Sequence, residues 1–197
     1  MTKNPIKKTW FHDFPLRGSR DYVHSASICT ALDNILASTD SCGFAVTMKQ
    51  WMNGRVHFAP KGALEFPIKG NIIVTLSDGS QRQIDFGDDP TVLISQRTPY
   101  DEDAIVRRAN VLKDRIIVPT DAPGSFFDKI IAANKKLINT IINPNVKLVA
   151  SKICIKTMMR PDTFSIQMDS HLGIRIFKSS IYDSCEKIGE VVFYGAR

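Results

Sequence analysis

The stretch SFFDKIIAANKKLINTII, residues 125–142, decides the fold. Its apolar residues recur at the three- and four-residue spacing of an amphipathic helix, and Asn134 alone interrupts the apolar stripe. Ser125 followed three residues later by Asp128 has the form of a helix-capping pair. Asn143-Pro144 disfavours further helix, because the residue before a proline avoids the helical region. The stretch therefore predicts a long helix with one apolar face.

Almost everything after this helix is typical of β-strands. Alternating or apolar runs, bounded by turn residues, predict strands at residues 146–158, 163–168, 173–179 and 188–194. Arg160-Pro161-Asp162 is predicted to join the first two of these strands as neighbours. One apolar helix followed by a run of antiparallel strands indicates a helix wrapped by a sheet, which is an α+β fold.

A weaker copy of this plan lies roughly a hundred residues upstream, a spacing longer than a solenoid repeat. A helix is predicted at 25–38, and strands at 10–15, 44–49, 55–59, 71–76, 81–86 and 91–95. Asn53-Gly54 and Asp78-Gly79 are hairpin signals, so each is expected to join partner strands. MKQWMNGRVHFA in the first half also parallels IKTMMRPDTFSI in the second. We interpret the chain as an internal duplication of a small α+β domain.

The charged segment between the two copies, with DEDAIVRRANVLKDR at its centre, is predicted to be a linker helix. The expected organisation is a first unit at 1–97, the linker helix at 98–114 and a second unit at 115–197. The second unit begins with RIIVP, a short strand at 115–119 that is the counterpart of the strand at 10–15.

Composition narrows the class of protein. Hydrophobic residues make up 43% and charged residues 23%, which is ordinary for a soluble globular chain. No apolar run reaches membrane-spanning length, and the N-terminal lysines are not followed by the apolar segment of a secretory signal. A cytoplasmic location is therefore expected. The formal net charge of +6 permits an anionic partner, but the basic residues are scattered, so a nucleic-acid surface is the less favoured interpretation.

Metal and redox chemistry have little support in the sequence. The four cysteines, Cys29, Cys42, Cys154 and Cys185, form no CxxC pair, and Cys29 and Cys154 fall on apolar faces that favour buried structural thiols. The histidines show no metal-ligand spacing, and there is no phosphate-binding glycine loop and no GxSxG motif. We expect neither a metal nor a cofactor.

The order of helix and strands resembles the hotdog fold, in which an antiparallel sheet wraps around a long helix. Two such units in one chain resemble a double hotdog protein. The resemblance covers nearly the whole chain in architecture. It implies an acyl-thioester ligand, because hotdog proteins are mostly thioesterases and hydroxyacyl dehydratases that act on coenzyme A or carrier-protein thioesters.

The resemblance also implies a site in the loop before the first helix. In RDYVHSASICTALD, residues 20–33, the thioesterase pattern of Asp, His and a helix carboxylate would be Asp21, His24 and Asp33. The chain departs from that pattern, because the glycine before the histidine is absent and Ser25-Ala26 replaces an asparagine pair. The His-Phe-Pro-Gly run of dehydratases is also missing.

The residues of this loop support the site on their own chemistry. His24 has a side chain that titrates near neutrality, so it suits a general base or a donor to a thioester carbonyl, although a capping or solvated histidine is the alternative. Asp33 could activate water or lie at the solvent edge of the helix. Arg17 and Arg20 flank Gly18-Ser19 before a helix and suit an anionic group such as phosphate.

The sequence therefore predicts an acyl-thioester binding protein, with acyl-CoA or acyl carrier protein as partner, and a thioesterase or hydroxyacyl dehydratase if it is an enzyme of lipid metabolism. A non-catalytic binding or assembly protein of the same fold is the alternative, followed by a nucleic-acid-associated basic protein. A monomer and a homodimer both stay open.

Overall fold

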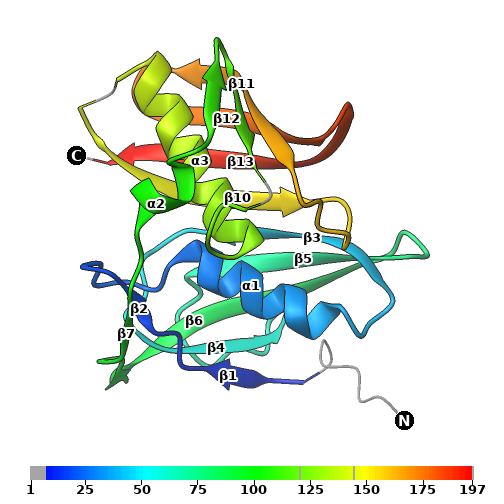
Figure 1. The fold of residues 1–197 in the computed structure, drawn as a ribbon. Coiled ribbons are helices and arrows are strands. Elements are labelled where there is room, and N and C mark those ends of the chain that lie inside the picture. The colour runs from blue at the N-terminus through cyan, green and yellow to red at the C-terminus, as the bar shows by residue number, and fades with distance from the viewer. Residues whose placement is uncertain (1–7, 120, 144, 197) are drawn as a thin grey trace. The chain divides into compact units, whose positions relative to one another are not determined.

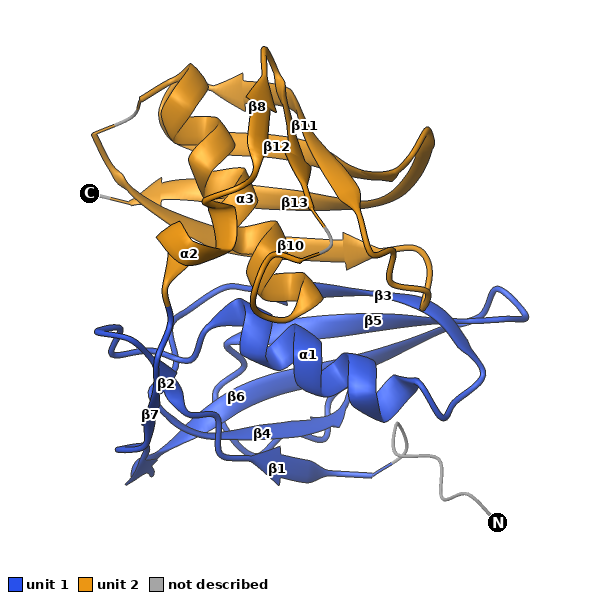
Figure 2. Cartoon of the chain, viewed as in Figure 1, with its two compact units in different colours: residues 1–100 blue, residues 101–197 orange. Residues whose placement is uncertain are grey.

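The computed structural model describes residues 8–119, 121–143 and 145–196 of the chain. The chain forms two compact units, residues 1–100 (unit 1) and residues 101–197 (unit 2), shown in Figure 2. Each unit has one long helix and an antiparallel sheet, so the predicted α+β fold of two helix-and-sheet units is confirmed. None of the described helices has the length and apolar character needed to cross a membrane.

In unit 1, helix α1 (Ser25–Leu36) turns Ile28, Leu32 and Leu36 into the core, where all three are buried. The main sheet has the order β1-β4-β6-β5-β3, and each neighbouring pair is antiparallel. A separate parallel pair joins β2 to β7. The strands are β1 (Trp10–His12), β2 (Leu16–Arg17), β3 (Ser41–Met48), β4 (Gly54–Pro60), β5 (Gly70–Leu76), β6 (Gln81–Leu93) and β7 (Arg97–Thr98).

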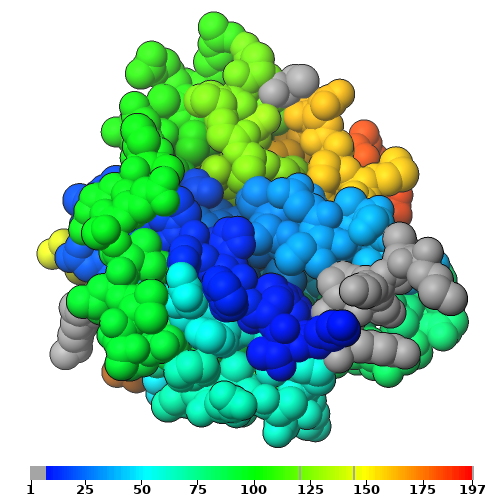
Figure 3. All heavy atoms as spheres, turned by 90° about the horizontal axis from the view of Figure 1, so that it is seen from below, coloured from blue at the N-terminus to red at the C-terminus, as the bar shows by residue number. Residues whose placement is uncertain are grey.

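Strand β1 is the edge strand of this sheet, and two of its three residues are exposed. The space-filling view of Figure 3 shows this start of unit 1, in dark blue, at the surface. Trp10 nevertheless stacks on Phe58 of β4, with the ring centroids 5.0 Å apart, so the edge strand is held to the sheet by an aromatic pair as well as by its ladder.

In unit 2, helix α3 (Phe126–Ile141) forms as its sequence predicts. Ser125 and Asp128 make the capping box, in which each side chain bonds the backbone N–H of the other residue. The apolar stripe is buried, and Asn134 is buried with it. The sheet has the order β10-β13-β12-β11-β9-β8. The other elements are α2 (Glu102–Val106), β8 (Asn110–Leu112), β9 (Arg115–Val118), β10 (Lys147–Ile155), β11 (Phe164–Leu172), β12 (Ile176–Asp183) and β13 (Glu186–Ala196).

Two of the predicted hairpins are wrong. β3 does not pair with β4 across Asn53-Gly54, because β3 pairs with β5 and β4 lies between β1 and β6. In the same way β10 pairs with β13, whereas β11 lies between β12 and β9. Turn residues show where a strand ends, but the partner of a strand is decided by packing between distant segments. The hairpin at Asp78-Gly79 is confirmed, since β5 pairs with β6 and Gly79 has φ +81°.

The two sheets also differ from each other. Unit 2 closes with two successive hairpins, which give the order β11-β12-β13. In unit 1 the connection at 61–69 crosses β6 instead, so the order is β4-β6-β5. The crossing passes so close to Gly87 of β6 that a Cβ there would lie 2.2 Å from the carbonyl oxygen of Pro67. The two halves share the order of elements along the chain. The strands of their two sheets, however, are not arranged in the same spatial order.

Two further predictions need correction. The linker helix expected at 98–114 is helical only in α2, and β8 follows it. β8 turns into β9 at Lys113, which has φ +54°, so pairing with β9 outweighs the helical propensity of this charged segment. The separate strand predicted at 91–95 is instead the end of β6, which runs without a break through Gly87 to Leu93.

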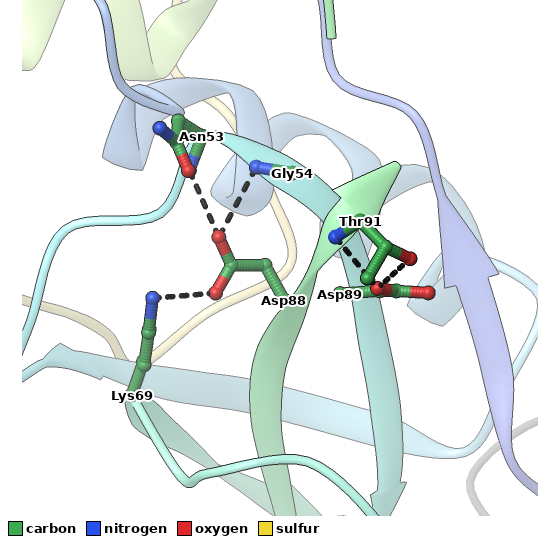
Figure 4. Close-up of polar contacts among 6 residues, drawn as sticks. All are labelled: Asn53, Gly54, Lys69, Asp88, Asp89 and Thr91. Carbon is green, nitrogen blue, oxygen red and sulfur yellow. Dashed lines mark hydrogen bonds and ion pairs between the residues drawn. The ribbon is translucent and has the colours of Figure 1, made fainter. Parts of the chain in front are cut away.

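The turn at Asn53-Gly54 has a different role, shown in Figure 4. The backbone N–H groups of Asn53 and Gly54 donate to one carboxylate oxygen of Asp88, at 2.9 and 3.1 Å. The other oxygen makes an ion pair with the Lys69 ammonium at 2.7 Å. Burial raises the pKa of the Asp88 carboxyl, but the Lys69 ammonium and the two N–H groups outweigh burial and hold the pKa below its ordinary value. Asp88 thus fixes both the β3–β4 connection and the crossing to β6.

Replacing Asp88 with asparagine is expected to destabilise the protein by about 1.5–3 kcal/mol, because the buried carboxylate loses its charge-assisted contacts to the partly exposed Lys69 ammonium and to the two N–H groups. The stabilisation by Asp88 is present above the pKa of an unfolded aspartate, about 3.9, and is lost as the pH falls through the lower folded pKa. Urea unfolding at pH 7 and at pH 3 measures both effects, and the difference between wild type and variant should shrink in acid. Asp40→Asn, at an exposed residue, is the control; an equal loss there would contradict the assignment.

Candidate functional site

The loop before α1 runs from β2 to His24 and is held by residues from the other end of unit 1. β2 pairs in parallel with β7, and the N–H of Gly18 donates to the carbonyl oxygen of Thr98 at 2.9 Å. Gly18 has φ +55°, a conformation that glycine adopts without steric cost, so the chain turns sharply here. The loop therefore has a defined shape and leads directly into the helix.

Arg97 holds this loop through three contacts. Its guanidinium donates to the carbonyl oxygens of Gly18 and Arg20, at 3.0 and 2.9 Å, and to the carboxylate of Asp21 at 2.6 Å. The Asp21 side chain is 86% exposed, so its described ion pair lies at the surface. Asp21 was predicted as a catalytic carboxylate, and the structure places it in the contact that fixes the loop.

Tyr100 is the centre of the candidate site. The guanidinium carbons of Arg20 and Arg17 lie 4.8 and 5.3 Å from the centre of its ring, which is cation–π distance. The imidazole ring of His24 lies 5.1 Å from the same ring. The four residues Arg17, Arg20, His24 and Tyr100 are called the Tyr100 cluster below. Three of them were predicted as site residues, and the structure brings these three together.

His24 is the N-cap residue of α1, but its side chain does not supply a capping hydrogen bond. It is only 4% exposed, so it lies inside the protein beside Tyr100 instead of in solvent. Arg17 is fixed in turn, because its Nε donates to the hydroxyl of Ser27 at 2.8 Å, one turn into the helix. The guanidinium groups of Arg17 and Arg20 thus lie near the N-terminus of α1, the positive end of the helix dipole, beside the buried imidazole of His24. This arrangement of positive charge favours an anionic group.

Asp33 is not brought to this cluster by α1. It lies eight residues beyond Ser25, which corresponds to about 12 Å along the helix axis. His24 and Asp33 therefore sit near opposite ends of the same helix. The predicted pairing of these two residues at one reacting centre has no support within unit 1.

Sequence reasoning missed Tyr100 and Arg97. Both lie far from the loop along the chain, and both follow β6 in a segment without regular periodicity. Their place depends on the parallel pairing of β2 with β7, two strands of two residues each. The only signal that could have found them is chemical, namely an arginine and a tyrosine close together just before the unit boundary.

Other reactive groups have structural surroundings. Cys29 is buried, as predicted. Burial raises the pKa of the Cys154 thiol, which disfavours the thiolate and agrees with a structural role. His57 packs against the ring of Phe66 at 4.3 Å. Among the residues that the structure describes, no three or more His, Cys, Asp or Glu side chains gather as a metal site would require.

Unit 2 has a polar cavity of about 390 Å³ between α2 and α3, but its lysines already have partners. Lys135 makes an ion pair with Glu102 at 2.8 Å, and the ammonium of Lys136 donates to the carbonyl oxygen of Val106 at 2.8 Å. These contacts bind α2 to α3. The two lysines that line the cavity thus serve the packing of α2 on α3.

No protein-family model matches the sequence, and no curated protein is similar to it. Solved structures do match. A protein assigned as a thioesterase II from Thermobifida fusca YX aligns over 97% of this chain and 93% of its own, with a TM-score of 0.52 and 10% identity. The tesB protein of Mycobacterium avium subspecies paratuberculosis aligns over 100% and 95%, with a TM-score of 0.51 and 9% identity.

A third match is the dehydratase domain of PpsC from Mycobacterium tuberculosis, solved in complex with C12:1-CoA. It aligns over 95% of this chain and 93% of its own, with a TM-score of 0.52 and 10% identity. The fold is that of a double hotdog. The predicted resemblance is therefore confirmed, and at about 10% identity it is a likeness of fold.

In this hotdog chain, Arg97→Met should loosen the loop that carries the Tyr100 cluster, because three contacts to residues 18–21 are lost together. Hydrogen exchange followed by mass spectrometry should show faster exchange in residues 17–24. The free energy of unfolding should change by less than about 1 kcal/mol, since Arg97 is partly exposed. Arg82→Met, an exposed arginine of β6, is the control, and unchanged exchange in Arg97→Met would show that Arg97 does not order the loop.

Proposed function

We propose that this hotdog protein binds an acyl thioester, carried by coenzyme A or by an acyl carrier protein, and that the Tyr100 cluster receives the anionic part of the carrier. The observation that supports the proposal is the convergence of Arg17, Arg20 and buried His24 on Tyr100 at the start of α1. Phosphate groups are the anions common to both carriers. Two guanidinium groups can each donate to phosphate oxygens, and Tyr100 keeps both groups at one place.

The fold supports the choice of ligand. One of the similar structures contains an acyl-CoA, and another is assigned as a thioesterase. A cytoplasmic location and a role in lipid metabolism are also part of this proposal. Both are consistent with coenzyme A esters as the ligand.

Binding is favoured over turnover by the positions of the carboxylates. Within unit 1, Asp21 is paired with Arg97 at the surface, and Asp33 lies about 12 Å along α1 from its start. Hydrolysis or dehydration by His24 would use this side chain as general base or as hydrogen-bond donor to the thioester carbonyl. That role is an alternative to phosphate binding by the cluster, because the pantetheine arm separates the phosphate of the carrier from the thioester. The non-catalytic acyl-thioester binding protein is therefore the favoured form of this proposal, an enzyme that uses His24 is the second candidate, and the experiments below separate the two.

The test is thermal shift and calorimetry with a panel of acyl-CoA esters, because a ligand that binds only the folded protein raises the melting temperature. Arg20→Ala should weaken binding about tenfold or more, since a charge-assisted hydrogen bond contributes about 1.5–3 kcal/mol. Arg82→Ala, the same change of charge on β6, should leave affinity unchanged. Absence of any shift, or equal weakening by both variants, would remove the proposed site.

His24→Ala distinguishes an enzyme from a binding protein. An enzyme that uses His24 as general acid or base should lose about 100-fold or more in turnover while the variant still binds acyl-CoA. Release of free coenzyme A, measured with a thiol reagent, reports hydrolysis, and loss of one water from a hydroxyacyl-CoA, measured by mass spectrometry, reports dehydration. Acyl-CoA binding by the wild type with neither release of coenzyme A nor loss of water would establish the non-catalytic candidate. Affinity for polynucleotide that falls steeply with salt, and none for acyl-CoA, would overturn both.

A further inference from the structure

The one polar residue in the stripe of α3 is unusual in its burial. Asn134 is 0% exposed, and neither its Oδ1 nor its Nδ2 has a hydrogen-bond partner among the described protein atoms. A buried amide without partners costs free energy, and such groups are rare in native proteins. A hydrogen-bond partner for the Asn134 amide is therefore expected in the same layer of the core.

Helix α1 shows that leucine can fill the corresponding position. The buried positions of the two helices coincide when five residues of α1 are set against five of α3. These are Ser25, Ile28, Cys29, Leu32 and Leu36 against Phe127, Ile130, Ile131, Asn134 and Ile138. In this alignment of the two buried patterns, Leu32 is the apolar counterpart of Asn134.

Ser179 of β12 is a second buried polar residue in unit 2. It is 0% exposed, and its hydroxyl also has no partner among the described protein atoms. It alternates with Phe177 and Ile181, both fully buried. Ser180 points to the opposite face, where its hydroxyl donates to Asp169 at 2.7 Å. Ser179 thus lies on the inner face of the sheet.

Asn134 and Ser179 lie at a similar estimated distance, along the helix and the strands, from the contact of Phe126 with Phe164. Phe126 at the start of α3 lies against Phe164 at the start of β11, with ring centroids 5.0 Å apart, and the two elements run in the same direction in Figure 1. Eight helical residues lead from Phe126 to Asn134, about 12 Å. Four strand residues lead from Phe164 to Met168, about 13 Å. Met168 is the register partner of Ser179 on β12.

We propose that Asn134 and Ser179 bind one water molecule in the core of unit 2, between α3 and the middle of β12. The amide both donates and accepts, and so does the hydroxyl, so a water molecule can exchange hydrogen bonds with each. Internal water in proteins is held by two to four such partners. The water links the central helix to the sheet at a fixed point, independently of any acyl ligand.

The proposal is tested with Asn134→Leu, Ser179→Ala and the double variant. Each single variant should raise the unfolding equilibrium constant about tenfold, because the remaining partner and the water lose a hydrogen bond. The double variant should raise it by much less than the product of the two, because both residues serve one water. Ser180→Ala, on the opposite face of β12, is the control, and its effect should multiply with that of Asn134→Leu.

Two outcomes would overturn the proposal. A more stable Asn134→Leu variant would mean that the amide is an uncompensated polar group, and effects that multiply would mean that the two side chains are independent. A high-resolution crystal structure of the unaltered chain gives a second answer that needs no variant to fold. Density for a water within hydrogen-bond distance of both side chains supports the site. A direct bond between Asn134 and Ser179, or no density, excludes it.

Discussion

The structure depends on the burial of one apolar helix face against a sheet in each unit. A fully buried aliphatic or aromatic side chain contributes about 1.5–3 kcal/mol relative to exposure, and α3 buries a complete stripe of them. A sheet supplies the matching surface only if alternate residues of its strands are apolar and face the helix. The alternation of buried and less buried residues along β4 and β5 follows this constraint, and the loops between strands are free to carry chemistry.

This dependence explains what could be predicted from the sequence. The two helices, most strands and the capping box of Ser125 and Asp128 follow from local spacing, and they are found where the spacing places them. The pairing of strands does not follow from spacing. Asn53-Gly54 has the sequence of a tight hairpin, yet its N–H groups bond Asp88, because the connection at 61–69 crosses β6 and brings Lys69 to the same carboxylate. Such a choice is made between segments far apart in the chain.

The residues of the candidate site also divide into those that the sequence predicts and those that it does not. Arg17, Arg20 and His24 are recognisable because they precede a helix within a few residues of one another. Tyr100 lies about 75 residues away, and its position depends on β2 and β7, which are too short to produce a pattern. Asp33 was a reasonable candidate by helix position, but the rise of the helix carries it away from His24. Distance along a helix is thus a stronger filter for such pairs than separation in sequence.

The closing of the loop by Arg97 and Tyr100 has a consequence for biosynthesis. A nascent chain that ends before residue 97 already contains α1 and every strand of the main sheet of unit 1, but it lacks the two residues that shape the loop and collect the arginines. The sheet can therefore form before the site does. A contact between residues at the two ends of a unit is expected to form late in folding, because closing so long a loop costs conformational entropy. The Tyr100 cluster is then expected to be the last part of unit 1 to become ordered during synthesis, because its central residue is also the last residue of the unit.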